Sequence, residues 1–185
     1  MGTRLKVENL KEVKIRRATA DDAAWVVDLS ARVQNSLTAA GSLQEIGPLP
    51  LSMVEVSIRG GYSYLLEIEE LRVGSVFVEP LDPSYPRTQT IRYVSWGVGN
   101  LPGPLFYLQS LMVEPAEQGK GLGLVFLDRI RRLMKEQGGT VVLDCWAGNP
   151  KLRNFYQEAG FIHYGNFPEN DYEISVYVQT LEKSP

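Results

Sequence analysis

The sequence predicts an α/β fold, and three observations carry this prediction. Short apolar runs typical of strands alternate along the 185 residues with segments whose apolar residues recur at helical spacing. A glycine-rich loop at 118–123 joins one such run to an amphipathic helix, and Asn149-Pro150 opens another helix after a further run. Strands that alternate with helices in this way build a sheet that the helices cover.

The first part of the chain is expected to hold a strand, two helices and a hairpin. Thr19 and Asp22 stand where the N-cap and the acidic first turn of a helix would be. Residues 51–59 alternate like a strand, but because they follow Pro48 and Pro50 we assign them to a helix. The predicted elements are a strand at 13–17, a helix after Thr19, a loop or broken helix at 34–50, a helix at 51–59, and hairpin strands at 62–68 and 71–78.

Residues 80–104 differ in composition from the rest of the chain. They contain five of the 11 prolines, together with Tyr85, Tyr93 and Trp96, and few charged residues. A disordered segment would contain fewer aromatic residues. We therefore expect an ordered, proline-rich excursion from the sheet, with a strand at 90–96.

The last part of the chain is expected to alternate between strands and helices. Phe126, Leu127 and Ile130 begin an apolar helical face that Gly138-Gly139 would end. A later helix would be capped by Asn149, and Gly160 would end it. The predicted elements are a strand at 105–113, the helix after the glycine loop, a strand at 140–146, a helix at 149–159 and a final strand at 174–178.

The segment from Gln118 to Gly123 carries the clearest chemical signal. Its three glycines let the backbone approach a ligand closely, and the free amides of the following helix would point at the same place, which suits a pyrophosphate. A Walker loop would need Ser or Thr after Lys120, and a dinucleotide fingerprint would need a wider glycine spacing. The loop fits neither pattern, and an ordinary strand-to-helix turn is the alternative.

Composition and charge argue against several classes of function. With 19 Lys and Arg against 22 Asp and Glu, the net charge of -3 offers no basic surface for nucleic acid or an anionic membrane. A single cysteine, Cys145, and a single histidine, His163, cannot form a disulfide or a Cys/His metal cluster, so we expect no metal. Without a signal peptide or an apolar span, we expect one cytoplasmic domain over 1–185, as a monomer or homodimer.

Two motifs, in this order and spacing, resemble the GCN5-related N-acetyltransferase (GNAT) family. The family's nucleotide loop has Gln or Arg, then Gly three residues on and Gly or Ala two further on, which is met by Gln118, Gly121 and Gly123. Its later helix has Asn, then Phe-Tyr, then Gly-Phe, which is met by Asn149, Phe155, Tyr156, Gly160 and Phe161. The distinctive motifs cover residues 108–161, and the segment at 15–23 also looks like the family's first strand and helix.

The resemblance implies a GNAT fold, with a mixed central sheet whose middle strands splay apart and helices on both faces, and acetyl-CoA as co-substrate. The pantetheine arm would pair along Leu111, Met112 and Val113, with the Leu111 N–H facing the acetyl carbonyl, where oxyanion charge develops. Asn149 would touch the pantetheine while it caps its helix. The pyrophosphate would rest on the backbone amides of Gln118, Gly119, Lys120, Gly121, Leu122 and Gly123.

Catalysis also needs an acid and a base. Tyr156 matches the position whose hydroxyl protonates the departing thiolate, although a core tyrosine is the alternative. The family position for a glutamate base, four residues before Leu111, holds Tyr107 here, and we favour Tyr107 acting through ordered water. Possible substitutes at strand ends, each more simply interpreted as a solvated surface acid, are Glu79, Glu114 and Asp144.

The remaining reactive or aromatic side chains have structural interpretations. His163 follows Gly160-Phe161 on an expected strand and Cys145 lies in a buried-strand pattern, so both are expected to be structural. Trp146 and Tyr64 would line an acceptor pocket or fill the core.

The expected function is acetyl-CoA-dependent N-acetylation of a primary amine, on a small molecule or peptide, by direct attack in a ternary complex. The alternatives are transfer of a different acyl group and a non-catalytic acyl-CoA-binding regulatory domain. The missing strand carboxylate is the reason to keep the regulatory domain as an alternative. Residues 34–50 and 80–104 are the expected specificity elements, or else plain connections or dimer contacts.

Overall fold

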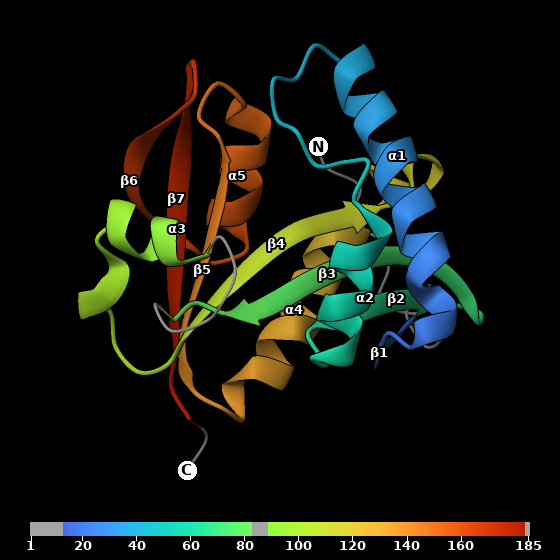
Figure 1. The fold of residues 1–185 in the computed structure, drawn as a ribbon, viewed down its shortest axis with the longest axis horizontal. Helices are drawn as coiled ribbons and strands as arrows, with labels where there is room; N and C mark the ends of the chain where they lie inside the picture. Colours follow the sequence, from blue (N-terminus) through green and yellow to red (C-terminus); the bar gives the residue numbers. More distant parts are fainter. Residues whose placement is uncertain (1–12, 83–88, 184–185) are drawn as a thin grey trace. The chain divides into compact units, whose positions relative to one another are not determined.

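The computed structural model describes residues 13–82 and 89–183, which divide into two compact units (Figure 1). Unit 1 comprises residues 13–41, 45–77 and 110–126, and unit 2 comprises the other described residues. Strands β3 (Leu71–Pro80) and β4 (Leu105–Val113) and helix α4 (Leu122–Lys135) each pass from one unit into the other. The chain therefore changes unit three times inside regular elements, and residues 42–44 of the loop after α1 also belong to unit 2.

The described strands form one mixed sheet in the order β1-β2-β3-β4-β5-β7-β6. Strands β4 and β5 are parallel, whereas the pairs β1–β2, β2–β3, β5–β7 and β6–β7 are antiparallel. The bounds of the other strands are β1 (Val13–Arg17), β2 (Ser63–Ile68), β5 (Gly139–Trp146), β6 (Ile162–Glu169) and β7 (Tyr172–Leu181). The predicted α/β fold with a mixed sheet is confirmed.

In unit 1, helices α1 (Ala23–Ala39) and α2 (Leu51–Arg59) bury their apolar faces in one core. Val26 and Leu29 of α1 and Val54 of α2 are fully buried there, with Leu65 and Phe77 of the strands. The helix at 51–59 is confirmed. The loop predicted from residue 34 is wrong for residues 34–39, which continue α1, because Leu37 still packs on this core.

The hairpin between β2 and β3 is confirmed, and its turn residues explain its geometry. Glu69 and Glu70 both have left-handed φ values, 49° and 66°, as a tight turn that follows the twist of the strands requires. Gly74 of β3 permits a close approach within unit 1, since a Cβ there would lie 2.8 Å from the Met112 carbonyl oxygen. Any larger residue at this position would push β3 away from the end of β4.

Unit 2 contains the antiparallel strands β5, β7 and β6, together with α3 (Gln89–Ser95) and α5 (Pro150–Glu158). Asn149 caps α5 as predicted, because its side-chain oxygen accepts the Leu152 N–H at 3.0 Å. A second core in this unit joins Leu81, Trp96, Tyr107, Val142 and Val176.

The strand predicted at 90–96 is wrong, because residues 89–95 form helix α3. Residues 90–96 are rich in β-branched and aromatic types, which favoured a strand. Tyr93 and Trp96, three residues apart, both pack on the core of unit 2, so a helical turn buries both rings where a strand would direct them to opposite faces. Tertiary packing thus decides this segment.

Three short 3-10 helices complete the described elements, η2 (Ala20–Asp22), η3 (Val98–Asn100) and η4 (Pro115–Glu117). In the part of the chain that the structure describes, no helix combines the length and apolar character needed to cross a membrane.

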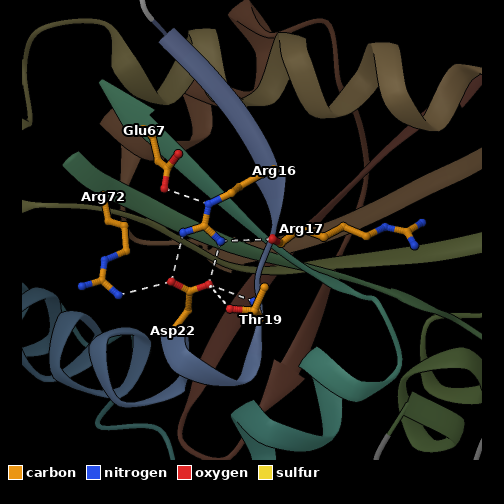
Figure 2. A network of polar contacts seen from close by, with 6 residues as sticks. All are labelled: Arg16, Arg17, Thr19, Asp22, Glu67 and Arg72. Carbon is orange, nitrogen blue, oxygen red and sulfur yellow. Dashed lines mark hydrogen bonds and ion pairs between the residues drawn. The ribbon is translucent and has the colours of Figure 1, made fainter. Parts of the chain in front are cut away.

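A polar network around Asp22 joins the first elements of unit 1 (Figure 2). The guanidinium of Arg16 donates to both Asp22 oxygens, at 2.7 and 3.0 Å, and Arg72 donates to Oδ1 at 3.2 Å. The backbone N–H of Thr19 donates to Oδ2 at 2.8 Å, as the predicted N-cap arrangement requires. Arg16 also donates to Glu67 on β2, at 2.8 Å. One carboxylate therefore fixes β1, the start of α1 and β3 together.

We predict that Asp22→Asn lowers the free energy of unfolding at pH 7 by about 2 to 3 kcal/mol. The Asp22 side chain is only 5% exposed, and the substitution takes its charge away from both Arg16 and Arg72. The 37% exposure of Arg16 and its remaining ion pair with Glu67 keep the cost below that of a fully buried pair. Urea unfolding measures the change. As a control, Asp128→Asn, which breaks the exposed Asp128–Arg132 pair, should change stability by less than about 0.5 kcal/mol.

The loss should depend on pH. The hydrogen bond from Arg16 holds the pKa of Asp22 well below its usual range, so this stabilisation is present above the unfolded pKa and disappears as pH falls toward the folded one. The difference between the wild type and Asp22→Asn should stay constant from pH 7 to 5 and shrink below about pH 4. Equal stability of the two proteins at pH 7 would contradict this account.

Candidate functional site

Strand β4 is irregular in its middle. Its parallel pairing with β5 covers only the three residues from Leu105 to Tyr107, opposite Thr140 to Val142, within the described residues. Ser110, three residues later, has a left-handed φ of 51°, which a non-glycine residue in a strand rarely adopts. The ladder of β4 to β5 thus ends after Tyr107, as the prediction of splayed middle strands requires.

In unit 1, the end of β4 runs directly into the glycine loop. The Val113 carbonyl accepts the Gln118 side-chain amide at 3.0 Å, and the Glu114 N–H donates to the Val73 carbonyl at 2.8 Å. Leu111 is half-buried, whereas Met112 and Val113 are buried. Gln118 therefore anchors the loop to the strand with its side chain, while its backbone N–H donates to the Pro115 carbonyl at 3.4 Å.

The loop has the torsions that its glycines predict. Gly119 and Gly121 have φ values of 78° and 81°, and residues 118–121 are exposed. A Cβ at Gly119 would meet nothing within 4 Å, so this glycine is needed for its backbone conformation and not for lack of space. Helix α4 begins at Leu122, and the amides of its first turn have no partner within the helix. Free amides at the start of a helix are the kind of group that binds an anion.

An ion pair fixes the residue before this loop. Arg32 of α1 donates to both carboxylate oxygens of Glu114, at 2.6 and 3.1 Å. The hydrogen bond to Glu114 raises the pKa of Arg32 above its usual range. Glu114 was a possible catalytic base in the sequence, and this two-point pair gives it a structural role in unit 1 instead.

In unit 2, Tyr107 and Asp144 form a buried acid pair. The Tyr107 hydroxyl donates a hydrogen bond to Oδ1 of Asp144, and only 4% of Tyr107 is exposed. Burial and then the Asp144 charge raise the pKa of Tyr107 well above its usual value. Burial also raises the pKa of Asp144, although the Tyr107 hydrogen bond and Arg92 oppose the rise. Asp144 is thus the proton acceptor of the pair and Tyr107 the donor.

Arg92 of α3 lies over this pair. Its guanidinium carbon is 5.1 Å from the centre of the Tyr107 ring and 5.8 Å from that of Trp96, and its Nη2 is 3.9 Å from a Glu169 oxygen. The Trp96 and Tyr107 rings meet edge to face at 5.7 Å. Arg92 was not among the predicted site residues, because a strand at 90–96 would not place its side chain beside Trp96, whereas a helix does.

Tyr156 on α5 is a buried tyrosine with aromatic neighbours in unit 2. It is 6% exposed and lies 6.0 Å from Tyr177 and 6.2 Å from Phe161, measured between ring centres. Burial, followed by the charges of Cys145 and Asp144, raises its pKa above the usual value. The phenol therefore stays protonated at neutral pH, as a proton donor must.

Other residues named from the sequence have mixed outcomes. Cys145 is fully buried, as predicted, and burial raises the pKa of its thiol to about 12. Glu79 is buried and accepts a hydrogen bond from Gln109 at 3.0 Å, and Asp144 is half-buried, so the interpretation of these two as solvated surface acids is wrong. His163 is exposed and contacts the Asn166 side chain at 2.9 Å. Tyr64 is buried in unit 1, and Trp146 is half-buried in unit 2.

Within residues 13–82 and 89–183, no group of three or more His, Cys, Asp or Glu side chains could hold a metal ion.

A family model identifies the family of the chain, and two curated proteins match parts of it. A sequence model of the acetyltransferase (GNAT) family matches residues 55–161. The probable glucosamine 6-phosphate N-acetyltransferase 2 of Oryza sativa subsp. japonica is 36% identical over 64 residues, 34% of this chain and 37% of that protein. The beta-hexosaminidase subunit beta of Rattus norvegicus is 29% identical over 133 residues, 60% of this chain and 24% of that protein. The chain thus spans about a third and a quarter of the length of these relatives.

Solved structures share the fold across nearly the whole chain. A GNAT acetyltransferase from Listeria monocytogenes superimposes with a TM-score of 0.73 at 23% identity, over 91% of this chain and 95% of that one. Another from Streptococcus agalactiae gives 0.73 at 15% identity, over 92% and 96%. At these identities the likeness establishes the fold.

We predict that the Cys145 thiol does not react in the native protein. It is fully buried and its pKa is raised to about 12, so almost no thiolate exists at pH 8. With the native protein at pH 8, Ellman's reagent should modify less than about 5% of the thiol before any protein unfolds. With the protein unfolded in concentrated urea, the reagent should modify all of it. Rapid modification of the native thiol would contradict its structural role.

Proposed function

The chain belongs to the acetyltransferase (GNAT) family, and from this premise we propose that it transfers the acetyl group of acetyl-CoA to a primary amine. The observation that carries the proposal is the glycine loop of unit 1, whose exposed amides and left-handed glycines follow β4 and open α4. The acceptor is a small molecule or a peptide. The acetylated amine named for the rice relative, glucosamine 6-phosphate, belongs to this class.

The donor is held by backbone groups. The pyrophosphate binds the amides of residues 118–123, where no carboxylate on the loop itself repels it. The pantetheine arm pairs with Leu111, Met112 and Val113, and the Leu111 N–H donates to the acetyl oxygen as negative charge develops there. The left-handed turn at Ser110 supports this role, because it redirects the backbone amide that follows it.

The base is the pair formed by Tyr107 and Asp144. Tyr107 alone is a poor base, since its pKa is raised and it holds its proton at neutral pH. Its hydroxyl already donates to Asp144, so it can accept a proton from the amine while it passes its own proton to the carboxylate. Burial strengthens Asp144 as a proton acceptor by raising its pKa. This relay replaces the glutamate that other family members place on the strand.

The full step is a direct transfer. The amine nitrogen attacks the thioester carbon, a C–N bond forms and the C–S bond breaks. The proton lost by the amine passes through Tyr107 to Asp144, and the Tyr156 hydroxyl protonates the departing thiolate. The products are the acetamide and the CoA thiol. The proton gained by Asp144 balances the proton given up by Tyr156, so a neutral amine releases no net proton, whereas an alkylammonium releases the one that it must lose before the attack.

The activity is tested by CoA thiol release across a panel of amines. Release that depends on the acceptor, with an acetylated product of the expected mass, supports the proposal. Tight binding of acetyl-CoA with no release for any amine would favour the regulatory acyl-CoA-binding domain, and release from longer acyl-CoA alone would favour a different acyl group.

We predict that Gly121→Glu lowers the affinity for acetyl-CoA by at least about 100-fold. A side chain at a φ of 81° is strained, and a carboxylate among the loop amides repels the pyrophosphate. Isothermal titration calorimetry measures the affinity. The matched control is Gly41→Glu, which adds the same charge at a left-handed glycine with open space around it and should bind acetyl-CoA as the wild type does. Equal affinity of the two variants would remove the loop from the donor site.

We predict that Tyr156→Phe lowers kcat about 10- to 100-fold at pH 7 and leaves the affinity for acetyl-CoA unchanged. The loss is smaller than for many general acids, because a thiolate leaves moderately well without a proton. Steady-state kinetics with a saturating acceptor give kcat. Tyr164→Phe, which removes an exposed hydroxyl bonded to the Gly97 carbonyl, is the control and should leave kcat as it is. An unchanged kcat in Tyr156→Phe would show that this hydroxyl does not act as the acid.

A further inference from the structure

We propose that Arg92 of α3 is a positioning residue for acetyl transfer, which keeps the Asp144 carboxyl ionised and ready to accept the proton from Tyr107. This inference rests on the proposed function and extends it to the proline-rich excursion. It gives helix α3 a catalytic task that neither the family motifs nor the sequence pattern indicates.

The geometry of Arg92 carries the proposal. Its guanidinium packs against the Tyr107 ring, 5.1 Å from the ring centre, and the hydroxyl of that same ring donates to Asp144. The guanidinium also packs against a second aromatic side chain, Trp96, with its carbon 5.8 Å from the ring centre. The Trp96 ring in turn contacts the Tyr107 ring edge to face. Trp96 is 4% exposed, so this arrangement is fixed by packing. A cation held beside a buried acid pair stabilises the ionised form of that pair.

Among the described residues, three charged or titratable groups shift the pKa of Asp144, each in a definite direction. Tyr107 on β4, by its hydrogen bond, and Arg92 on α3, by its charge, lower the pKa of Asp144. Burial and Glu169 on β6 raise it, and burial has the larger effect. Cys145 on β5 and Tyr156 on α5 stay neutral because their own pKa values are raised. Arg92 is thus the cation that opposes burial at this carboxyl.

Arg92 is itself suited to remain charged. Burial on its own would lower its pKa, but the acidic groups of Tyr107, Asp144 and Glu169 outweigh that effect and raise it. The Glu169 carboxylate also lies near the guanidinium, with its Oε1 3.9 Å from Nη2. Glu169 and Asp144 therefore compete for one cation. Removing the cation and removing the competitor should shift the titration of Asp144 in opposite directions.

The test is the pH dependence of kcat/KM in two variants of opposite effect. Arg92→Gln should move the acidic limb to higher pH by about 0.5 to 1 unit, because Asp144 then holds its proton to higher pH. Glu169→Gln should move the limb to lower pH. Arg92→Lys, which keeps the cation, should restore most of the wild-type profile. Arg132→Gln, which removes an exposed arginine of α4, is the control and should not move it.

A general structural disturbance would move the acidic limb of both variants in the same direction. Opposite shifts in Arg92→Gln and Glu169→Gln therefore support the proposal. Shifts of the same sign, or no shift in either variant, would overturn it. If Arg92→Gln does not fold, Glu169→Gln and Arg92→Lys carry the test, and an unmoved limb in Glu169→Gln overturns the proposal alone.

A second measurement separates this inference from the proposed function. The carboxyl carbon of Asp144, observed by NMR in the resting protein with labelled aspartate and identified with Asp144→Asn, reports its pKa without turnover. If no amine gives CoA release, the proposed function fails. If the Asp144 titration is the same in the wild type, Arg92→Gln and Glu169→Gln, the role of Arg92 fails, whatever the activity.

Discussion

The geometry of β4 is the constraint on which the functional features of this chain depend. Its pairing with β5 ends after Tyr107, and Ser110 then adopts a left-handed conformation within the strand. Backbone amides rarely stay without partners. Where β4 no longer pairs with β5, its backbone N–H and C=O groups can bond to another extended chain. We propose that the pantetheine arm is this partner.

The same strand connects the donor loop with the proton chemistry. Toward its end, β4 leads through Gln118 and its bond to Val113 into the exposed loop amides. Toward its start, it carries Tyr107, whose hydroxyl is bonded to Asp144. A family member without the usual strand glutamate can thus still accept a proton, since burial gives Asp144 a raised pKa and Tyr107 provides the path. Arg92 prevents burial from neutralising this carboxyl altogether.

Local features of this fold could be predicted from the sequence, and long-range ones could not. The glycine torsions, the Asn149 cap and the Glu69-Glu70 turn depend on neighbouring residues, and the structure confirms all three. Helix α3 depends on burying Tyr93 and Trp96 together, which propensity does not encode. The Tyr107–Asp144 bond joins residues 37 positions apart, and the left-handed residue of β4 is a serine with no local signal.

The most direct test of this account is the rate of acceptor-dependent CoA release by Asp144→Asn compared with the wild type. We expect kcat/KM for the amine to fall about 100-fold or more at pH 7, with unchanged affinity for acetyl-CoA. The deficit should shrink at high pH, where solution supplies the free amine. Equal rates for the two proteins at pH 7, with a wild type that acetylates amines, would contradict the assignment of Asp144 as the proton acceptor.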